Sequence, residues 1–197
     1  HLTFYGFRYI RVDEFPGGLY KADPSCFTAI AVHSDMKRTG YLSCSNPLLN
    51  QLFSNIVWGQ KGNFVDVPTD CPQRDERLGW TGDAQVFVRT ACLNYDAEKF
   101  FTKWLADMSA EQRPDGYVGH VIPDLIQAPK ASAAWGDAAT ICPWEVYLAF
   151  GDKQILENQF DCMKGWVNYI TSTTKDQYLW TGGEHYGDWL GLDAPSG

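Results

Sequence analysis

Apolar residues recur at helical spacing over most of the chain after residue 45. In the first such stretch Leu48, Leu52 and Ile56 stand four positions apart, behind an Asn46-Pro47 pair that is a strong helix start. Further helices are predicted over residues 83–93, 96–112, 135–150 and 153–172. Because these helices are joined alternately by short and long loops, the pattern predicts a mainly α chain that forms part of an α/α toroid.

The connections refine this prediction. Asp96 is expected to cap the third helix, and Gly151 to end the fourth. Between these two helices lies a loop of about twenty residues, 113–134, which contains Pro123 and Pro129. Loops of this length are uncommon in compact domains unless they are functional.

The first forty residues follow a different pattern. Residues 2–12 and 27–33 are rich in aromatic and β-branched side chains, and a turn at 15–18 separates them, so both are predicted strands. The two strands resemble the last strands of a β-sandwich, and residues 35–45 are expected to form a linker. Two strands alone cannot bury a face, so this part should pack on the helices or be poorly ordered.

Polar residues concentrate in one stretch, residues 67–87. Four carboxylates fall within fourteen positions, interleaved with two arginines and a tryptophan: Asp70, Arg74, Asp75, Glu76, Arg77, Trp80 and Asp83. Prolines and glycines break up regular structure here, so the stretch is predicted to be a loop, with a helix starting near Asp83. Carboxylates, arginines and an aromatic ring gathered on a loop are typical of a pocket that binds a polar ligand.

Composition narrows the possible ligands. The 197-residue chain is 45% apolar and 15% aromatic, contains eight tryptophans, and carries a formal charge of −8 without a basic run. This charge argues against nucleic acid or an anionic membrane as a partner, and no stretch approaches the ~20 apolar residues of a membrane span. An acidic, aromatic-rich chain suits carbohydrate binding, although most of the rings are expected to lie in a helical core.

The cysteines and the chain ends add three expectations. The six cysteines form no C-x-x-C pair and have no histidine at metal-binding spacing, so we expect reduced, buried thiols and no metal or other cofactor. The chain has no signal peptide and begins at His1, and it ends at Gly197 directly after a motif, so we expect a piece of a larger protein. The sequence does not decide between the cytoplasm and export.

The polar stretch carries a family resemblance. The run D-C-P-Q-R-D-E-R-L-G-W-T-G-D-A-Q (70–85) resembles the signature of bacterial α-L-rhamnosidases, glycoside hydrolase family 78. The likeness continues through four further segments: N-P-L-L-N-Q-L-F-S-N-I-V-W-G-Q-K-G-N-F (46–64), A-A-W-G-D-A-A (133–139), P-W-E-V-Y (143–147) and Y-G-D-W-L (186–190). It implies that residues 1–40 end a β-sandwich domain and that residues 41–197 begin an (α/α)₆ catalytic barrel of six-hairpin type.

The resemblance also implies roles for single residues. The family places its general acid at the position of Glu76, and three acidic neighbours in sequence are expected to help this carboxyl keep its proton. The sugar subsite then includes Asp70, Arg74, Trp80, Asp83, Trp135 and Trp189, with Asp188 as a plausible partner. The expected substrate is a terminal α-L-rhamnosyl residue of a glycoside or polysaccharide, cleaved with inversion. No acid here matches the family's general base, which is expected beyond Gly197, so the chain alone should have little or no activity.

Other readings of the same residues stay open. Arg74 and Arg77 can simply neutralise Asp75 and Glu76 in a salt-bridged loop, and Asp137 can be an acid favoured by the helix dipole. The whole chain can be a carbohydrate-binding protein without catalysis, or a six-hairpin glycosidase for another sugar. A calcium site built from the four carboxylates is opposed by the interleaved arginines and has no EF-hand spacing.

Overall fold

The structure is a computed structural model that describes residues 3–176, 178–183, 185–187 and 189, and it is mainly helical. Its α-helices are α1 (Pro47–Asn63), α2 (Thr81–Asn94), α3 (Glu98–Glu111), α4 (Ala138–Phe150) and α5 (Gln154–Thr173). The shorter elements are the 3₁₀ turns η1 (Leu19–Lys21) and η2 (Pro24–Cys26) and an antiparallel pair of two-residue strands, β1 (Phe64–Val65) and β2 (Val67–Pro68). All five predicted helices are therefore confirmed.

The helix ends follow local hydrogen bonds. Asn46 caps α1 by accepting a hydrogen bond from the Leu48 N–H at 2.9 Å, and Gly151 closes α4 in the left-handed region at φ 78°, both as predicted. The predicted cap of α3 is wrong by one residue, because Ala97 occupies that position. The Asp96 N–H instead donates to the Lys37 carbonyl at 2.8 Å, which ties it to the segment before α1.

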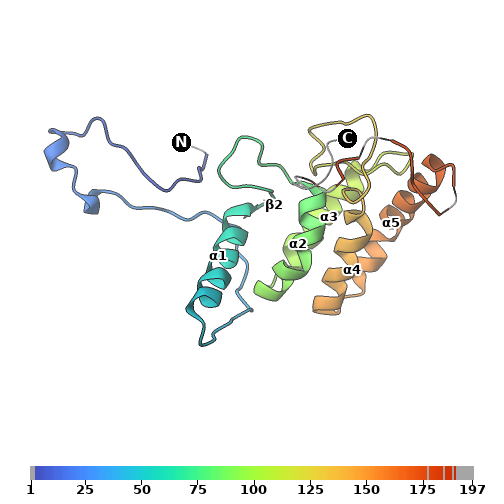
Figure 1. Ribbon diagram of the computed structural model, residues 1–197, viewed down its shortest axis with the longest axis horizontal. Coiled ribbons are helices and arrows are strands. Elements are labelled where there is room, and N and C mark those ends of the chain that lie inside the picture. Colours follow the sequence, from blue (N-terminus) through green and yellow to red (C-terminus); the bar gives the residue numbers. More distant parts are fainter. Residues whose placement is uncertain (1–2, 177, 184, 188, 190–197) are drawn as a thin grey trace.

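The core lies among α2, α3, α4 and α5, which stand side by side in Figure 1, with α4 packed against the other three. Phe101, Trp104 and Leu105 of α3 are fully buried there. The Phe64 ring, which follows α1, stacks on Phe100 with centroids 4.5 Å apart. The long loops before α2, between α3 and α4, and after α5 gather at one end of the helices, at the top of Figure 1, and this end carries the predicted site.

Helix α1 stands apart from this group and is joined to it by buried polar contacts. The Gln60 side chain donates to the Ala91 carbonyl at 3.2 Å and accepts from the Asn94 amide at 3.0 Å. Leu48 and Trp58 remain exposed at 77% and 58%. The residues that the structure describes therefore leave part of the apolar surface of α1 exposed.

The strands predicted at residues 2–12 and 27–33 are not shown in the described part of this chain. Residue 2 lies outside the described residues, and between residues 3 and 45 the structure shows turns and extended chain, with one isolated bridge from Arg38 to Tyr95. A strand needs a hydrogen-bonded neighbour, and neither segment has one, so Tyr9 and Ile30 stay exposed at 86% and 81%. Figure 1 shows this segment reaching away from the helices, with a contact where Arg77 lies over the Phe4 ring.

The six cysteines, all within the described residues, are free thiols. The four at Cys71, Cys92, Cys142 and Cys162 are buried, as expected, whereas Cys26 and Cys44 are exposed because they lie in the extended segment before α1. Among the described residues, no helix combines the length and the apolar character that a membrane crossing requires.

Candidate active site

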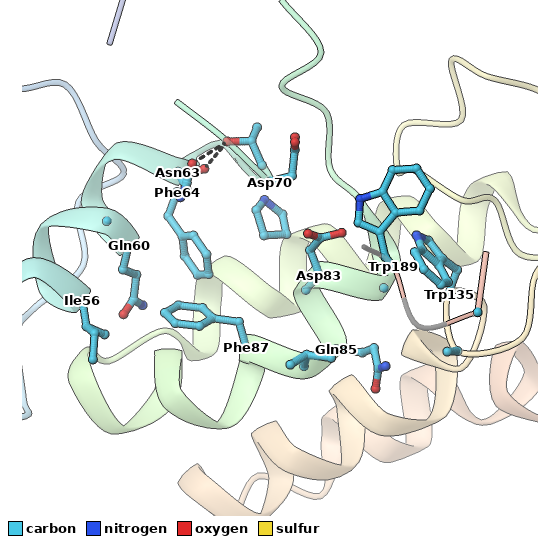
Figure 2. A pocket seen from close by; sticks show the side chains of 18 residues that line it. Ile56, Gln60, Asn63, Phe64, Asp70, Asp83, Gln85, Phe87, Trp135 and Trp189 are labelled. Atoms are coloured by element: carbon cyan, nitrogen blue, oxygen red, sulfur yellow. Dashed lines mark hydrogen bonds between the residues drawn. The ribbon is translucent and has the colours of Figure 1, made fainter. Parts of the chain in front are cut away.

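A small cavity of about 220 Å³ lies where the loops meet. Three segments far apart in sequence line it, and together they contribute Asp70, Glu76, Trp80, Asp83, Trp135, Tyr186 and Trp189. Six of these seven residues are site residues predicted from the sequence. A larger cavity of about 580 Å³ adjoins it and shares the two aspartates and two of the tryptophans. Figure 2 shows this larger cavity, with Asp83 between Asp70 on one side and Trp135 and Trp189 on the other.

The loop of residues 70–80, which we call the signature loop, is closed by hydrogen bonds near its two ends. Asp70 and Leu78 exchange two hydrogen bonds at 3.2 Å, one from the Asp70 N–H to the Leu78 carbonyl and one from the Leu78 N–H to the Asp70 carboxylate. The Gly79 carbonyl then accepts from the Ile122 N–H at 2.9 Å. A Cβ at Gly79 would lie 2.2 Å from the Ile122 carbonyl oxygen, so this close approach of two loops requires glycine.

The same two loops set the start of α2. The Thr81 N–H donates to the His120 carbonyl at 2.9 Å, and the Thr81 hydroxyl reaches the same carbonyl at 3.0 Å. Trp80 and Val121 form a backbone bridge beside them. Because these bonds begin the helix at Thr81, two residues before the predicted start, Asp83 lies in the first turn of α2 and faces the cavity.

The acids of the cavity lie in different surroundings. Burial, followed by the nearby Asp70 carboxylate, raises the pKa of Asp83 above its ordinary value. Glu76 forms an ion pair with Arg74 at 3.1 Å, and both side chains are more than half exposed. One ion pair of the salt-bridged loop expected from the sequence is therefore present, and its Glu76 also lines the cavity.

Opposite these acids stands a group of rings that we call the aromatic wall: Trp135, Tyr186 and Trp189. The Tyr186 ring lies 4.5 Å from Trp135 and 5.7 Å from Trp189, centroid to centroid. Sequence reasoning gave no role to Tyr186. The sequence signal that could have identified it was its position in segment 185–189, which is rich in aromatic and carboxylate side chains and contains the predicted Trp189.

Asp137 supports this wall from behind. Its carboxylate accepts hydrogen bonds from Trp166 Nε1 and from the Ala134 N–H, both at 2.9 Å. It therefore fixes the turn that presents Trp135, and it makes no cap hydrogen bond to α4. His185 has a similar supporting place, because its Nδ1 accepts from the Ala133 N–H at 3.0 Å.

Among the predicted site residues that the structure describes, Arg74 is not part of the cavity lining. It meets the site through its ion pair with Glu76. Asp188 lies outside the described residues. A weaker sequence candidate on the long loop, Asp124, is bound instead to Arg113, whose Nη2 lies 3.3 Å from its carboxylate.

A group of possible metal ligands also lies at the cavity, but its chemistry does not suit a cation. Asp70, Cys71 and Glu76 each place one donor atom within 4.8 Å of the other two. Burial, with Asp70 beside it, raises the pKa of the Cys71 thiol, which therefore keeps its proton at neutral pH. The Glu76 carboxylate is already paired with the positively charged Arg74 guanidinium at 3.1 Å.

Paired helices with an acidic and aromatic cavity at one end are the arrangement expected of part of an α/α toroid. The family described as the bacterial α-L-rhamnosidase six-hairpin glycosidase domain matches residues 37–197, and the chain belongs to this family. The resemblance stated from the sequence is therefore confirmed.

Individual relatives agree with this assignment. An α-L-rhamnosidase of Formosa agariphila is 44% identical over 174 residues, which cover 88% of this chain and 19% of the relative. One from Alteromonas sp. is 42% identical over 188 residues, covering 95% of this chain and 20% of the relative. This chain thus spans about a fifth of the length of these relatives.

Solved structures are similar as well. The α-L-rhamnosidase of Aspergillus terreus superposes with a TM-score of 0.79 at 46% identity, over 85% of this chain and 20% of that chain. The Streptomyces avermitilis α-L-rhamnosidase complexed with L-rhamnose superposes with a TM-score of 0.77 at 42% identity, over 80% of this chain and 15% of that chain. At these identities the likeness extends to the sequence as well as to the fold.

Proposed function

We propose that the protein carrying this chain hydrolyses terminal α-L-rhamnosyl residues of glycosides or polysaccharides, with inversion at the anomeric carbon. The observation that supports this most is the small cavity, which sets Asp70, Glu76 and Asp83 opposite tryptophans in a chain that belongs to a rhamnosidase family. Its volume of about 220 Å³ suits one sugar unit. The larger cavity beside it has room for the group that the sugar leaves.

Each residue has a role that fits its chemistry. Glu76 protonates the leaving oxygen, and Asp70 and Asp83 accept hydrogen bonds from sugar hydroxyls. Trp80, Trp135 and Trp189 offer apolar faces to the ring, and Asp188, which lies outside the described residues, is retained from the sequence as a further candidate for binding the sugar. Arg74 holds the Glu76 carboxylate until substrate arrives.

The second carboxylate of the reaction is proposed to lie beyond Gly197. An inverting enzyme needs roughly 6.5–9.5 Å between its two carboxyl groups, so that a water fits between sugar and base. Oxygens of Asp70 and Glu76 lie within 4.8 Å of each other, which is too close for that arrangement. We also propose that residues 1–40 end a β-sandwich domain, whose strands form beside the partners they need, and that residues 41–197 begin the catalytic toroid.

The anomer released first tests this proposal. A protein of the relatives' length that carries this chain is given an aryl α-L-rhamnoside, and proton NMR follows the first turnovers, with the aryl α-D-glucoside as control. We expect β-L-rhamnose first and no release from the glucoside. If α-L-rhamnose appears first, the mechanism is retaining and Asp70 becomes the candidate nucleophile. Sugar binding without any turnover would support the alternative, a non-catalytic carbohydrate-binding protein.

A further inference from the structure

The aromatic wall has one ring at its centre. Tyr186 contacts the rings of Trp135 and Trp189 and also that of Trp80, whose centroid lies 6.2 Å away. Trp135 Nε1 is buried and has no hydrogen-bond partner among the described residues. Packing against Tyr186, and not a hydrogen bond of its own, therefore helps to orient the Trp135 ring.

Tyr186 itself is anchored at two points. Its N–H donates to the Ser132 hydroxyl at 3.3 Å, and its phenol oxygen lies 2.9 Å from Nδ1 of His120. Burial raises the pKa of the phenol, so the hydroxyl keeps its proton and remains able to hydrogen-bond. Tyr186 is thus held in place through its backbone N–H and its hydroxyl group.

His120 suits the role of a fixed anchor. It is only 6% exposed, and burial lowers the pKa of its ring, which favours the neutral form. The Lys130 carbonyl lies near the ring and favours the charged form, but Nε2 has no partner at hydrogen-bonding geometry among the described residues. The carbonyl of His120 also receives both hydrogen bonds of Thr81 that begin α2. His120 therefore joins the aromatic wall to the helix that carries Asp83.

We propose that Tyr186 is a sugar-contacting residue of the wall and that His120 is a positioning residue that acts through it. The inference rests on the proposed function, because it assigns these two residues to the same sugar site. Their hydrogen bond sets the angle of the Tyr186 ring, and that ring sets the tryptophans against which the sugar packs. A histidine that only filled the core would have no such influence on binding.

The test uses four variants of the 197-residue chain: Tyr186→Phe, His120→Ala, His120→Asn and the Tyr186→Phe/His120→Ala double variant. Tyr178→Phe is the matched control, because Tyr178 is 87% exposed and lies outside both cavities. Near-ultraviolet circular dichroism without ligand reports the ring arrangement. Calorimetry with L-rhamnose reports the dissociation constant, and thermal unfolding reports stability.

We expect Tyr186→Phe and His120→Ala to change the near-ultraviolet spectrum in the same way and to weaken L-rhamnose binding by about fivefold, the worth of one hydrogen bond. The double variant should be no weaker than Tyr186→Phe, since both changes break one interaction. His120→Asn keeps a polar group near the position of Nδ1 and should recover most of the affinity. If His120→Ala fails to fold, the Asn and Phe variants still carry the test.

Three results would overturn the inference: an unchanged spectrum, losses that add in the double variant, or a lower Tm with unchanged affinity. If the unsubstituted chain binds no L-rhamnose, that result counts against the sugar site of the proposed function. The spectra of the variants then still decide whether His120 positions the wall.

Discussion

The two sides of the small cavity are built in different ways. The side formed by the signature loop carries the acids, and its Arg74–Glu76 pair is more than half exposed. The aromatic side is held from behind by part-buried hydrogen bonds, one between His120 and Tyr186 and one from Trp166 to Asp137. Under the proposed function, this difference corresponds to a division of labour, in which the more exposed loop supplies the catalytic group and the more buried wall supplies the shape of the site.

This division has a consequence for substitutions. Exposed ion pairs contribute little to folding, about 0–1 kcal/mol, so the acidic side can change with small effects on stability. Buried donors that lose their acceptors cost about 1–3 kcal/mol, so changes behind the aromatic wall should lower stability and binding together.

Asp137→Ala should have the largest effect on stability. It removes the acceptor of the Trp166 N–H and of the Ala134 N–H, which costs about 2 kcal/mol and lowers the Tm by about 4–8 °C. Because the turn before Trp135 loosens, L-rhamnose binding should weaken as well. Thermal unfolding and calorimetry measure the two effects.

Asp152→Ala is the matched control for this change. Asp152 also precedes a helix, and its carboxylate accepts one exposed hydrogen bond from the Gln154 N–H at 2.9 Å. Its loss should cost about 1 kcal/mol or less and leave sugar binding unchanged. Equal effects of the two substitutions would contradict a special role for the contacts behind the wall.

Gly82→Ala should disturb the shape of the cavity with a smaller loss of stability. A Cβ at residue 82 would lie 2.7–2.9 Å from ring atoms of Trp135, so the ring must move. We expect L-rhamnose affinity to fall by about fivefold to tenfold, the worth of one aromatic contact. Calorimetry, with tryptophan fluorescence as a second readout, measures the change.

Gly59→Ala provides the control, because a Cβ there meets nothing within 4 Å and the residue lies within α1, where it lines the larger cavity but not the small one proposed for the sugar. It should raise stability by up to about 1 kcal/mol through helix propensity alone. Affinity for L-rhamnose should stay as it is. A loss of binding in this variant as well would mean that the Gly82 result does not report on Trp135.

Asp83→Asn should give the smallest effect on the Tm, and it should raise the Tm instead of lowering it. The pKa of Asp83 is raised in the folded chain, so its ionised form opposes folding, and this penalty appears as pH rises above the ordinary value of 3.8. The substitution should therefore raise the Tm at pH 7 by about 2 °C or less, and the gain should vanish near pH 3.5. Asp161→Asn, at an exposed site on α5, should show no such gain; a gain that persists at pH 3.5 would exclude the electrostatic explanation.

The sequence predicted the acidic side better than the aromatic side. The acids from Asp70 to Asp83 fall within fourteen consecutive positions, so their clustering needed no knowledge of the fold. His120 and Tyr186 are 66 residues apart, and only the packing of two loops brings them together. The five helices were predictable from apolar spacing. The strands predicted near the N-terminus are not shown in the described residues, because a strand depends on neighbours that its own residues do not specify.

The division of labour is tested most directly by Glu76→Gln in a protein of the relatives' length that carries this chain. We predict that kcat for a rhamnoside with an alcohol leaving group falls by roughly 10²–10⁴, the contribution of a general acid, while L-rhamnose affinity changes less than about twofold and the Tm stays within about 1 °C. Asp75→Asn, next to it but outside the cavity lining, should leave all three unchanged. A Glu76→Gln protein with normal kcat, or one that loses binding and stability together with turnover, would contradict the account.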